Sequence, residues 1–219
     1  IEVELKSLHR MEVTYEYVIT ILDNEGVKHG QVVWYYDDFT KITEGNLWVY
    51  DPLGNILDRV KINQMTDMSY TGSNFYDDQR VKYYTVLQKK EPYTVNYKYK
   101  KVVSETYSLP TWYPQQAEDI YVEEANYKLI NSSKLKYRTY IHGNEDSILR
   151  IETPENTTPI TTFQVQDIFP FDMEKYGPRF SEQVLGIHFP LESFQVDGYY
   201  GLFDNWKNYG QWIYELNSG

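Results

Sequence analysis

The stretch "YTVNYKYK", from Tyr93 to Lys100, decides the fold of this chain. Its first, third, fifth and seventh residues are tyrosine or valine, and threonine, asparagine or lysine stand between them. Successive side chains of a strand point to opposite faces of a sheet. One face is therefore expected to be buried and the other solvated, which is typical of antiparallel sheets. We expect an amphipathic strand whose tyrosine face is buried.

The same period of two extends over most of the chain. It recurs in "EVTYEYVITIL" (residues 12–22), after which "DNEG" has the composition of a turn. The stretch "GNLWVYDPLGNILDRVKI" (residues 45–62) predicts strand, turn and strand, with Pro52 and Gly54 in the turn. Two more strands are expected around residues 131–133, and a further pair within residues 147–168.

The last part of the chain has a different composition. Residues 169–205 are rich in Pro, Gly and Phe and show weak periodicity, so we expect irregular chain with a few short strands. In "DNWKNYGQWIYEL" (residues 204–216), apolar residues recur at helical spacing, and Asp204 can cap the helix. We predict an all-β fold: one antiparallel β-sandwich domain over residues 1–203, with a long irregular C-terminal stretch, and a short terminal α-helix in residues 204–219.

Charge and composition argue against several classes of partner. The 219 residues include 32 acidic and 21 basic ones, a net charge of −11, which repels nucleic-acid phosphates. No apolar run approaches the roughly 20 residues that span a bilayer, so we expect no membrane insertion by this chain. The chain has no cysteine, which excludes disulfides and a cysteine nucleophile. Because it starts without Met, we interpret it as trimmed after a targeting segment and expect an exported protein, periplasmic or in the cell envelope.

Two Tyr-Asp-Asp triplets, at residues 36–38 and 76–78, resemble the carboxylate pair of a metal-binding polymerase hairpin. We favour strand-edge turns, because the sequence shows no third acid, general base or phosphate cradle beside either pair. The four histidines lack the spacing of metal ligands. We therefore predict no catalytic residue, no metal and no cofactor, although two distant carboxylates could still meet in the fold.

The segment "LPTWYPQQ" (residues 109–116) is the best candidate for a ligand-binding surface. Trp112 and Tyr113 stand between two prolines, and aromatic rings on a stiff loop can stack on a sugar or grip a peptide. The alternative is that Trp112 closes an open end of the sandwich core, and we favour that alternative.

The terminal helix is expected to lead to a further domain. Trp206, Tyr209, Ile213 and Leu216 form one apolar stripe, with Trp212 beside it. We predict an interdomain contact through Trp206, Tyr209 and Trp212, with Trp212 partly exposed in this chain.

Several segments, taken in order, carry a resemblance to a known family: "WVYDPLGNILD" (48–58), "NFYDDQRVKYYTV" (74–86), "KKEPYTVNYKYKKV" (89–102), "ANYKLINSSKLKYRTYI" (125–141), "TTFQVQDIFPFDMEKYGP" (161–178) and "GYYGLFDNWKNYGQWIYEL" (198–216). Together they resemble the uncharacterised β-rich domain that precedes transglutaminase-like domains in secreted or envelope proteins of Gram-negative bacteria. The chain departs from that pattern in "DPLGN", which lacks the usual acidic-Gly pair, and in "KKEP", which replaces a Gly-containing turn.

The resemblance implies a non-catalytic N-terminal accessory domain that positions or presents substrate. Its partner would be a downstream transglutaminase-like, papain-like domain in the same chain. The Cys-His-Asp triad of such domains is impossible here because the chain has no cysteine. The main alternative is a carbohydrate- or peptide-binding module that uses exposed aromatic residues, and a glycan-processing enzyme is a third hypothesis.

Overall fold

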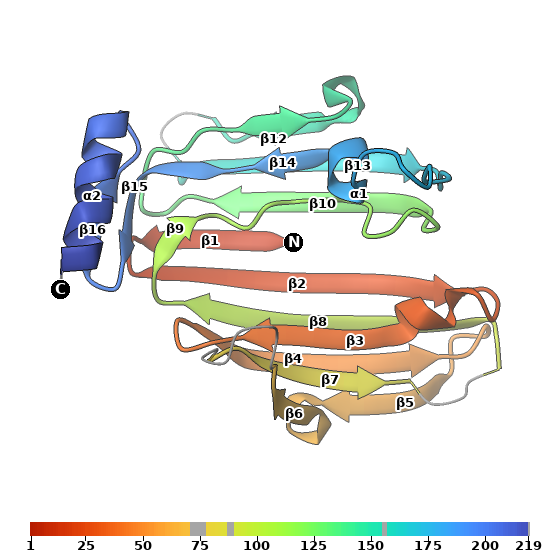
Figure 1. Ribbon diagram of the computed structural model, residues 1–219. Helices are drawn as coiled ribbons and strands as arrows, with labels where there is room; N and C mark the ends of the chain where they lie inside the picture. Colours follow the sequence, from red (N-terminus) through yellow and green to blue (C-terminus); the bar gives the residue numbers. More distant parts are fainter. Residues whose placement is uncertain (71–77, 87–89, 155–156, 219) are drawn as a thin grey trace. The chain divides into compact units, whose positions relative to one another are not determined.

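The computed structural model describes residues 1–70, 78–86, 90–154 and 157–218. It is an all-β structure of several sheets that ends in one longer helix, as predicted (Figure 1). The chain divides into two compact units: unit 1 comprises Ile1–Glu12 and the segment from Ser104 onward, and unit 2 comprises Val13–Val103. The predicted single domain over residues 1–203 stays a prediction; the terminal helix belongs to unit 1. No helix of the described residues is long and apolar enough to cross a membrane.

Unit 2 is built from two facing sheets. The larger has the strand order β2 (Arg10–Ile21), β8 (Tyr93–Val103), β4 (Thr40–Tyr50) and β5 (Ile56–Lys61). The smaller has the order β3 (Gln31–Tyr36), β7 (Arg80–Thr85) and β6 (Thr66–Ser69), and all its pairings are antiparallel. Short 3-10 helices, η1 (Gly26–Gly30) and η2 (Ile62–Gln64), follow β2 and β5. One hydrophobic core takes residues from both sheets, which makes unit 2 a small β-sandwich.

Strand β8 has the faces that its sequence predicts. Tyr93, Val95 and Tyr99 are buried, whereas Lys98 is exposed and pairs with Glu16 at 2.8 Å. Trp34 of β3 covers the tyrosine face, with its ring stacked 4.7 Å from that of Tyr99. A Cβ atom at Gly45 would lie 2.3 Å from Trp34, so only glycine leaves room for this ring.

The main sheet strands of unit 1 follow the order β12 (Leu149–Glu152), β13 (Ile160–Ile168), β10 (Val122–Ile130) and β1 (Glu2–Ser7). Two small sheets accompany them, one of β11 (Tyr140–His142) with β14 (Gly186–His188), the other of β16 (Tyr199–Leu202), β15 (Pro190–Val196) and β9 (Thr106–Ser108). The helices are η3 (Glu145–Ser147), α1 (Phe180–Gln183) and α2 (Trp206–Ser218). Its fully buried residues include Leu5, Tyr127, Leu129, Phe163, Phe189, Leu191 and Phe194.

One expectation for unit 1 needs correction, and two others agree with the structure. Strand β1 pairs with β10 in parallel, not antiparallel, because period two determines which face is buried but not the direction of a neighbour. The two strands expected around residues 131–133 are β10 and β11, and β11 pairs with β14. Residues 169–205 contain a few short strands, as predicted, and two of these, β15 and β16, form an antiparallel hairpin whose turn has positive φ at Asp197 and Gly198.

Candidate functional site

The two residues predicted to bind a ligand, Trp112 and Tyr113, are held inside unit 1. Trp112 is 2% exposed, and its backbone exchanges hydrogen bonds of 2.9 and 2.8 Å with Ile187. Its ring packs 6.0 Å from that of Tyr127, so the core-closing alternative describes it, and its ring cannot serve as an exposed platform. Tyr113 is half-buried over Gly186 and meets His188 edge-on, with 5.9 Å between the ring centres.

The first Tyr-Asp-Asp triplet forms the turn between β3 and β4, as predicted. The Asp37 carboxylate accepts a 3.0 Å bond from the backbone N–H of Phe39, and Asp37 and Thr40 exchange backbone bonds. Of the second triplet only Asp78 is within the described residues, and it accepts a 3.0 Å bond from the N–H of Asp38. Among the residues described, no group of three or more His, Asp or Glu could hold a metal ion.

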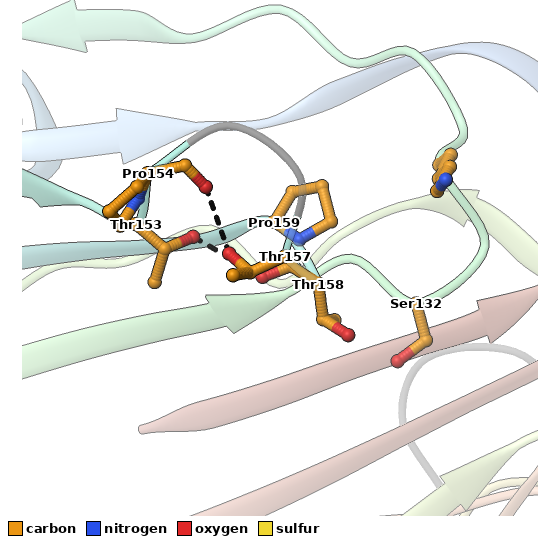
Figure 2. Close-up of a pocket in the computed structure, with 7 residues that line it drawn as sticks. Ser132, Thr153, Pro154, Thr157, Thr158 and Pro159 are labelled. Carbon is orange, nitrogen blue, oxygen red and sulfur yellow. Dashed lines mark hydrogen bonds between the residues drawn. The ribbon is translucent and has the colours of Figure 1, made fainter.

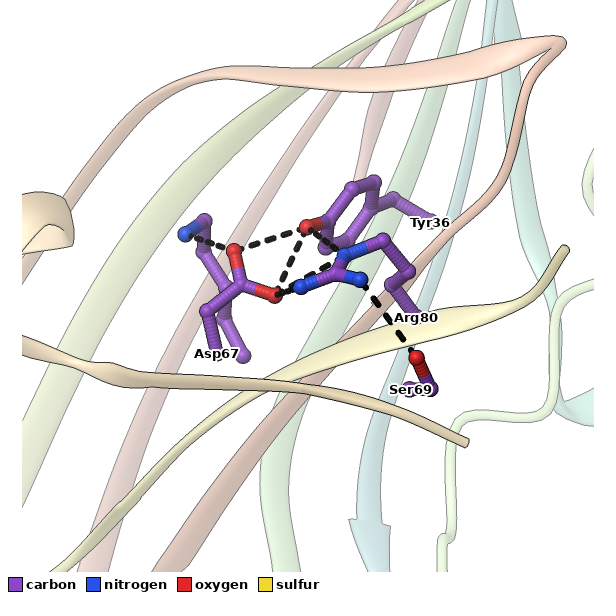
Figure 3. A network of polar contacts seen from close by, with 5 residues as sticks. Tyr36, Asp67, Ser69 and Arg80 are labelled. Atoms are coloured by element: carbon purple, nitrogen blue, oxygen red, sulfur yellow. Dashed lines mark hydrogen bonds and ion pairs between the residues drawn. The ribbon is translucent and has the colours of Figure 1, made fainter. Parts of the chain in front are cut away.

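A polar network on the small sheet of unit 2 surrounds Asp67 (Figure 3). The Asp67 carboxylate accepts bonds from the Tyr36 hydroxyl at 2.7 Å, Arg80 at 2.8 Å and Lys82 at 2.6 Å. Desolvation alone would raise the pKa of Asp67, but these donors outweigh it and lower the pKa to about 2. A general base needs a pKa near the working pH, so this carboxylate is suited to tie β3, β6 and β7 together.

A cavity of about 750 Å³ in unit 1 borders the loop after β12 (Figure 2). It is lined by Ser132, Lys134, Thr153, Pro154, Thr157, Thr158 and Pro159. Two of its hydroxyls serve the loop itself: Thr157 donates to the carbonyl of Pro154 at 2.9 Å, and Thr153 donates to that of Thr158 at 3.2 Å. These two groups therefore shape the loop and do not converge on a ligand.

A second cavity, of about 480 Å³, lies on the outer face of the larger sheet of unit 2. It is lined by Val18, Thr20, Leu22, Tyr50, Asp51, Pro52, Gly54, Pro92, Tyr93, Thr94 and Asn96. Its volume lies within the range of roughly 300–1,000 Å³ that is typical of ligand sites. Val18 and Leu22 are apolar, although they stand at solvent-facing positions of the alternating pattern, where they are 65% and 73% exposed. This cavity is the candidate functional site of the molecule.

The polar groups of this cavity come mainly from neighbouring strands of the larger sheet. The hydroxyls of Thr20 on β2 and Thr94 on β8 are 3.0 Å apart. Register places Tyr50 opposite Thr94 and Trp48 opposite Asn96, so both aromatic residues share the outer face. The Asn96 side-chain oxygen is buried and has no hydrogen-bond partner among the described residues. An unmade bond of this kind costs about 1–3 kcal/mol, which a ligand that supplies a donor would recover.

The turn of residues 51–55 forms one rim of the cavity. The Asp51 carboxylate accepts bonds from the N–H groups of Leu53 and Asn55, at 2.9 and 2.8 Å, and from the Asn55 amide at 2.9 Å. The Asn55 side-chain bond is the main cause that holds the pKa of Asp51 below its ordinary value. The rim is therefore stiff and negatively charged at neutral pH.

Sequence reasoning missed this site. The alternation predicts a plain solvated surface for the polar face of these strands. The cavity forms only where β2, Pro92 and the β4–β5 turn come together. The one available signal was that Val18 and Leu22 are apolar at positions where the pattern calls for polar residues. The same face carries Trp48 and Tyr50, which alternate with the buried Leu47 and Val49.

The predicted interdomain residues of α2 are arranged differently from expectation. Trp212 is 6% exposed, its indole N–H donates to the carbonyl of Tyr199 at 3.2 Å, and its ring lies 4.8 Å from Phe194. The expectation that Trp212 is partly exposed is wrong, because the helix turns this residue and Tyr209 inward. Trp206, which was assigned to the apolar stripe, is 87% exposed. The helix is capped by Asn205, which accepts a 2.9 Å bond from the N–H of Asn208, and not by Asp204.

Comparison with known proteins adds a family and a fold. The family model described as "Domain of Unknown Function with solved-structure structure (DUF3857)" matches residues 8–172. Among solved structures, the chain is similar to a crystal structure described as that of "a putative protease from Parabacteroides distasonis", with a TM-score of 0.70 and 13% sequence identity. The similarity covers 88% of this chain and 39% of that chain, and at this identity it shows the fold alone. No curated protein matches the chain.

Proposed function

Because the chain belongs to the DUF3857 family, whose model matches residues 8–172, we propose that it is a non-catalytic accessory domain. It positions or presents substrate to a catalytic domain of the same protein. The observation that carries the proposal is that the fold recurs in a much longer chain, of which it accounts for 39%. The remainder of such a chain has room for a catalytic domain.

The chemistry of the described side chains supports a role in holding rather than converting a substrate. The carboxylates of Asp37, Asp51 and Asp67 each accept bonds that stabilise a turn or a sheet. The cavity of unit 2 offers apolar walls, the hydroxyls of two threonines and two tyrosines, and an amide. Such groups bind and orient a molecule, whereas covalent chemistry would require an activated nucleophile or a base.

We further propose that the catalytic partner is a transglutaminase-like domain of the papain-like class, in a protein exported to the periplasm or cell envelope. The ordered motifs between residues 48 and 216 support this identification through their resemblance to the domain that precedes such enzymes. The protease description of the longer chain agrees with an enzyme that acts on amide bonds.

A deletion experiment on the full-length protein tests the proposal. Kinetics on a peptide substrate are compared for the full-length protein and a variant lacking residues 1–219. We expect the deletion to raise KM by about tenfold or more with a smaller change in kcat, which is the loss of a binding interaction that does not act in the transition state. An unchanged kcat/KM, or turnover by residues 1–219 alone, contradicts the proposal.

A second candidate function is a binding module whose ligand is a carbohydrate or peptide and whose role is independent of catalysis. The cavity of unit 2 favours it, because its exposed valine and leucine serve no core. The two candidates separate in the same experiment, since a free-standing module binds its ligand but leaves the kinetics of any attached domain unchanged.

A further inference from the structure

The walls of the unit 2 cavity are mostly aliphatic. Val18 on β2, Leu22 directly after β2, Pro52 and Pro92 all contribute to the lining. The two aromatic residues among the lining are Tyr50, which is half-buried, and Tyr93, which is 2% exposed and belongs to the core. Aliphatic and prolyl walls of this kind match the branched shape of an apolar amino-acid side chain better than the flat face of a sugar, which stacks on an open aromatic ring.

The charge of the cavity restricts its ligand further. Its described lining contains no lysine, arginine or histidine, and its one ionisable acid is Asp51 on the rim. The bonds from Asn55 and Leu53 keep that carboxylate charged. The chain as a whole carries −11. A phosphate or carboxylate ligand would be repelled, whereas a cationic group beside an apolar one would be attracted.

The unpaired side-chain oxygen of Asn96 also bears on the ligand. Among the described residues, Trp34, Asn96 and His142 each have a buried side-chain atom that lacks a hydrogen-bond partner. Trp34 lies in the closed core against Gly45, and His142 stands in the β11–β14 pair. Only the Asn96 oxygen belongs to a residue that lines this cavity, so a peptide N–H seated deep in the cavity would supply its missing donor.

We propose that this cavity binds a peptide through an apolar side chain that is followed by a lysine or arginine. The apolar side chain lies between Val18, Leu22 and Pro92, the peptide N–H donates to Asn96, and the basic side chain faces Asp51. The assignment rests on the proposed function, because it names the substrate class that this accessory domain would present.

The test is an NMR titration of the ¹⁵N-labelled chain with the probe N-acetyl-Leu-Lys-amide. Three further probes are N-acetyl-Leu-Glu-amide, N-acetyl-Gly-Lys-amide and the neutral disaccharide N,N′-diacetylchitobiose. We expect the Leu-Lys probe to shift the amide signals of Thr20, Thr94 and Asn96 and to bind at least about fivefold more tightly than the other two peptides. Shifts at these residues with the disaccharide alone would overturn the peptide assignment, as would equal affinity for all three peptides.

Two leucine variants provide a matched pair. Leu22→Ser removes a cavity wall at a 73% exposed position, and Leu149→Ser makes the same change on β12 at a 57% exposed position of unit 1. We expect Leu22→Ser to weaken binding of the Leu-Lys probe by about fivefold or more, and Leu149→Ser to change it less than twofold. Equal effects of the two variants would show that the probe binds elsewhere.

The peptide-binding test and the deletion experiment can give opposite results, so the peptide site and the accessory role are tested separately. Loss of substrate positioning on deletion, together with no binding of the Leu-Lys probe, refutes the peptide site and leaves the accessory role standing. Binding that Leu22→Ser removes, together with unchanged kinetics on deletion, supports the site and refutes the accessory role.

Discussion

Two aromatic clusters, one on β2 and β8 and one around α2, are built on different principles. In unit 2, rings on β2 and β8 stack in pairs: Tyr15 on Tyr99 at 4.8 Å and Tyr17 on Tyr97 at 5.1 Å. Neighbouring strands hold their side chains at a fixed spacing, so the backbone sets this stacking. In unit 1, rings around α2 meet at mixed angles, from 24° between Tyr209 and Trp212 to 81° between Phe194 and Trp212. There the side chains themselves decide the arrangement.

The difference determines how firmly each cluster is held. The paired tyrosines of unit 2 share their face with residues such as Leu47 and Val95, which are fully buried, and Trp34 covers them. Helix α2 has 13 residues and buries one of them, Trp212. A helix of that length is marginal alone in water, so the packing of Trp212 and Tyr209 must hold it. We infer that the first cluster is part of the global fold and the second can open locally.

The largest expected effect tests the first cluster. Tyr99→Ala removes a ring that is 8% exposed and stacked on both Tyr15 and Trp34. We expect the free energy of unfolding to fall by about 3–5 kcal/mol, as for other large aromatic truncations. Lys98→Ala, next to it on the solvated face, should change it by less than about 0.5 kcal/mol. Urea denaturation measures both, and equal costs would mean that the two faces of β8 are not distinct.

The same substitution at two glycines should give opposite signs. A Cβ at Gly45 would lie 2.3 Å from the Trp34 ring, whereas one at Gly210 in α2 meets nothing within 4 Å. We expect Gly45→Ala to destabilise the chain by about 1–3 kcal/mol through overpacking. Gly210→Ala should stabilise α2 by up to about 1 kcal/mol, because alanine favours a helix interior. Thermal melts of the two variants check this, and a stabilising Gly45→Ala would show that Trp34 is not held rigidly over the tyrosines.

The two clusters should also differ in how much stability they lose in alkaline solution. Burial, and then the neighbouring Tyr17, raises the pKa of Tyr15 to about 12, while the unfolded chain releases the proton near pH 10. The folded state therefore binds the proton more tightly, so its contribution to stability is complete below about pH 10 and is lost as the pH rises to about 12. Burial also raises the pKa of Tyr107 in the α2 cluster to about 12, but that residue is 40% exposed, so solvent screening should make its contribution smaller.

Urea denaturation between about pH 9.5 and 11.5 measures this loss in the wild type and in two Tyr→Phe variants. We expect Tyr15→Phe to remove roughly 2 kcal/mol of the decline, and Tyr107→Phe to remove less. A decline that is identical in the wild type and in Tyr15→Phe would contradict the prediction.

The strands of unit 2 could be predicted because each side chain of a strand lies on one of only two faces of the sheet, and the apolar residues mark the buried face. On β8 and β2 that choice is unambiguous. On β7 it is not. The alternation of Val81, Tyr83, Thr85 and Leu87 predicts one common face, and Leu87 lies outside the described residues. In the structure Tyr84 and Val86 pack into the core, and Val81 is buried as well. Pairing with β3 places Tyr84 opposite Val32, and that register is not visible in β7 alone.

Helix α2 and the cavity could be predicted less well, for related reasons. Aromatic and aliphatic residues occur around most of the helix, so its sequence does not select between a face with Trp206 and a face with Trp212. The cavity depends on a turn at residue 51, a strand at residue 18 and a proline at residue 92. Contacts between residues this far apart in the sequence leave no periodic pattern. The only indication of them is that Val18 and Leu22 are apolar on a face that is otherwise polar.

The smallest expected effect concerns the exposed face of α2. Trp206 is 87% exposed and Tyr214 is 73% exposed, whereas Trp212 on the other side of the helix is 6% exposed. Trp206→Ala should therefore change the stability of this chain by less than about 0.5 kcal/mol. Trp212→Ala removes the ring that anchors the helix to Phe194 and Tyr199, so it should abolish hydrogen-exchange protection over residues 206–218.

If a catalytic domain packs against α2 in the full-length protein, as the proposed accessory function suggests, Trp206→Ala should affect the helix more strongly there than in this chain. Exposed aromatic side chains are the usual anchors of such interfaces. In the full-length protein we expect greater protection of residues 206–218 than in this chain, and Trp206→Ala should return that protection to the level of the shorter chain. Gly210→Ala serves as the control, because it adds helix propensity without removing an aromatic contact. If protection is the same in both lengths and Trp206→Ala is silent in both, the outer face of α2 is plain surface, and the contact with a further domain must be sought elsewhere in the chain.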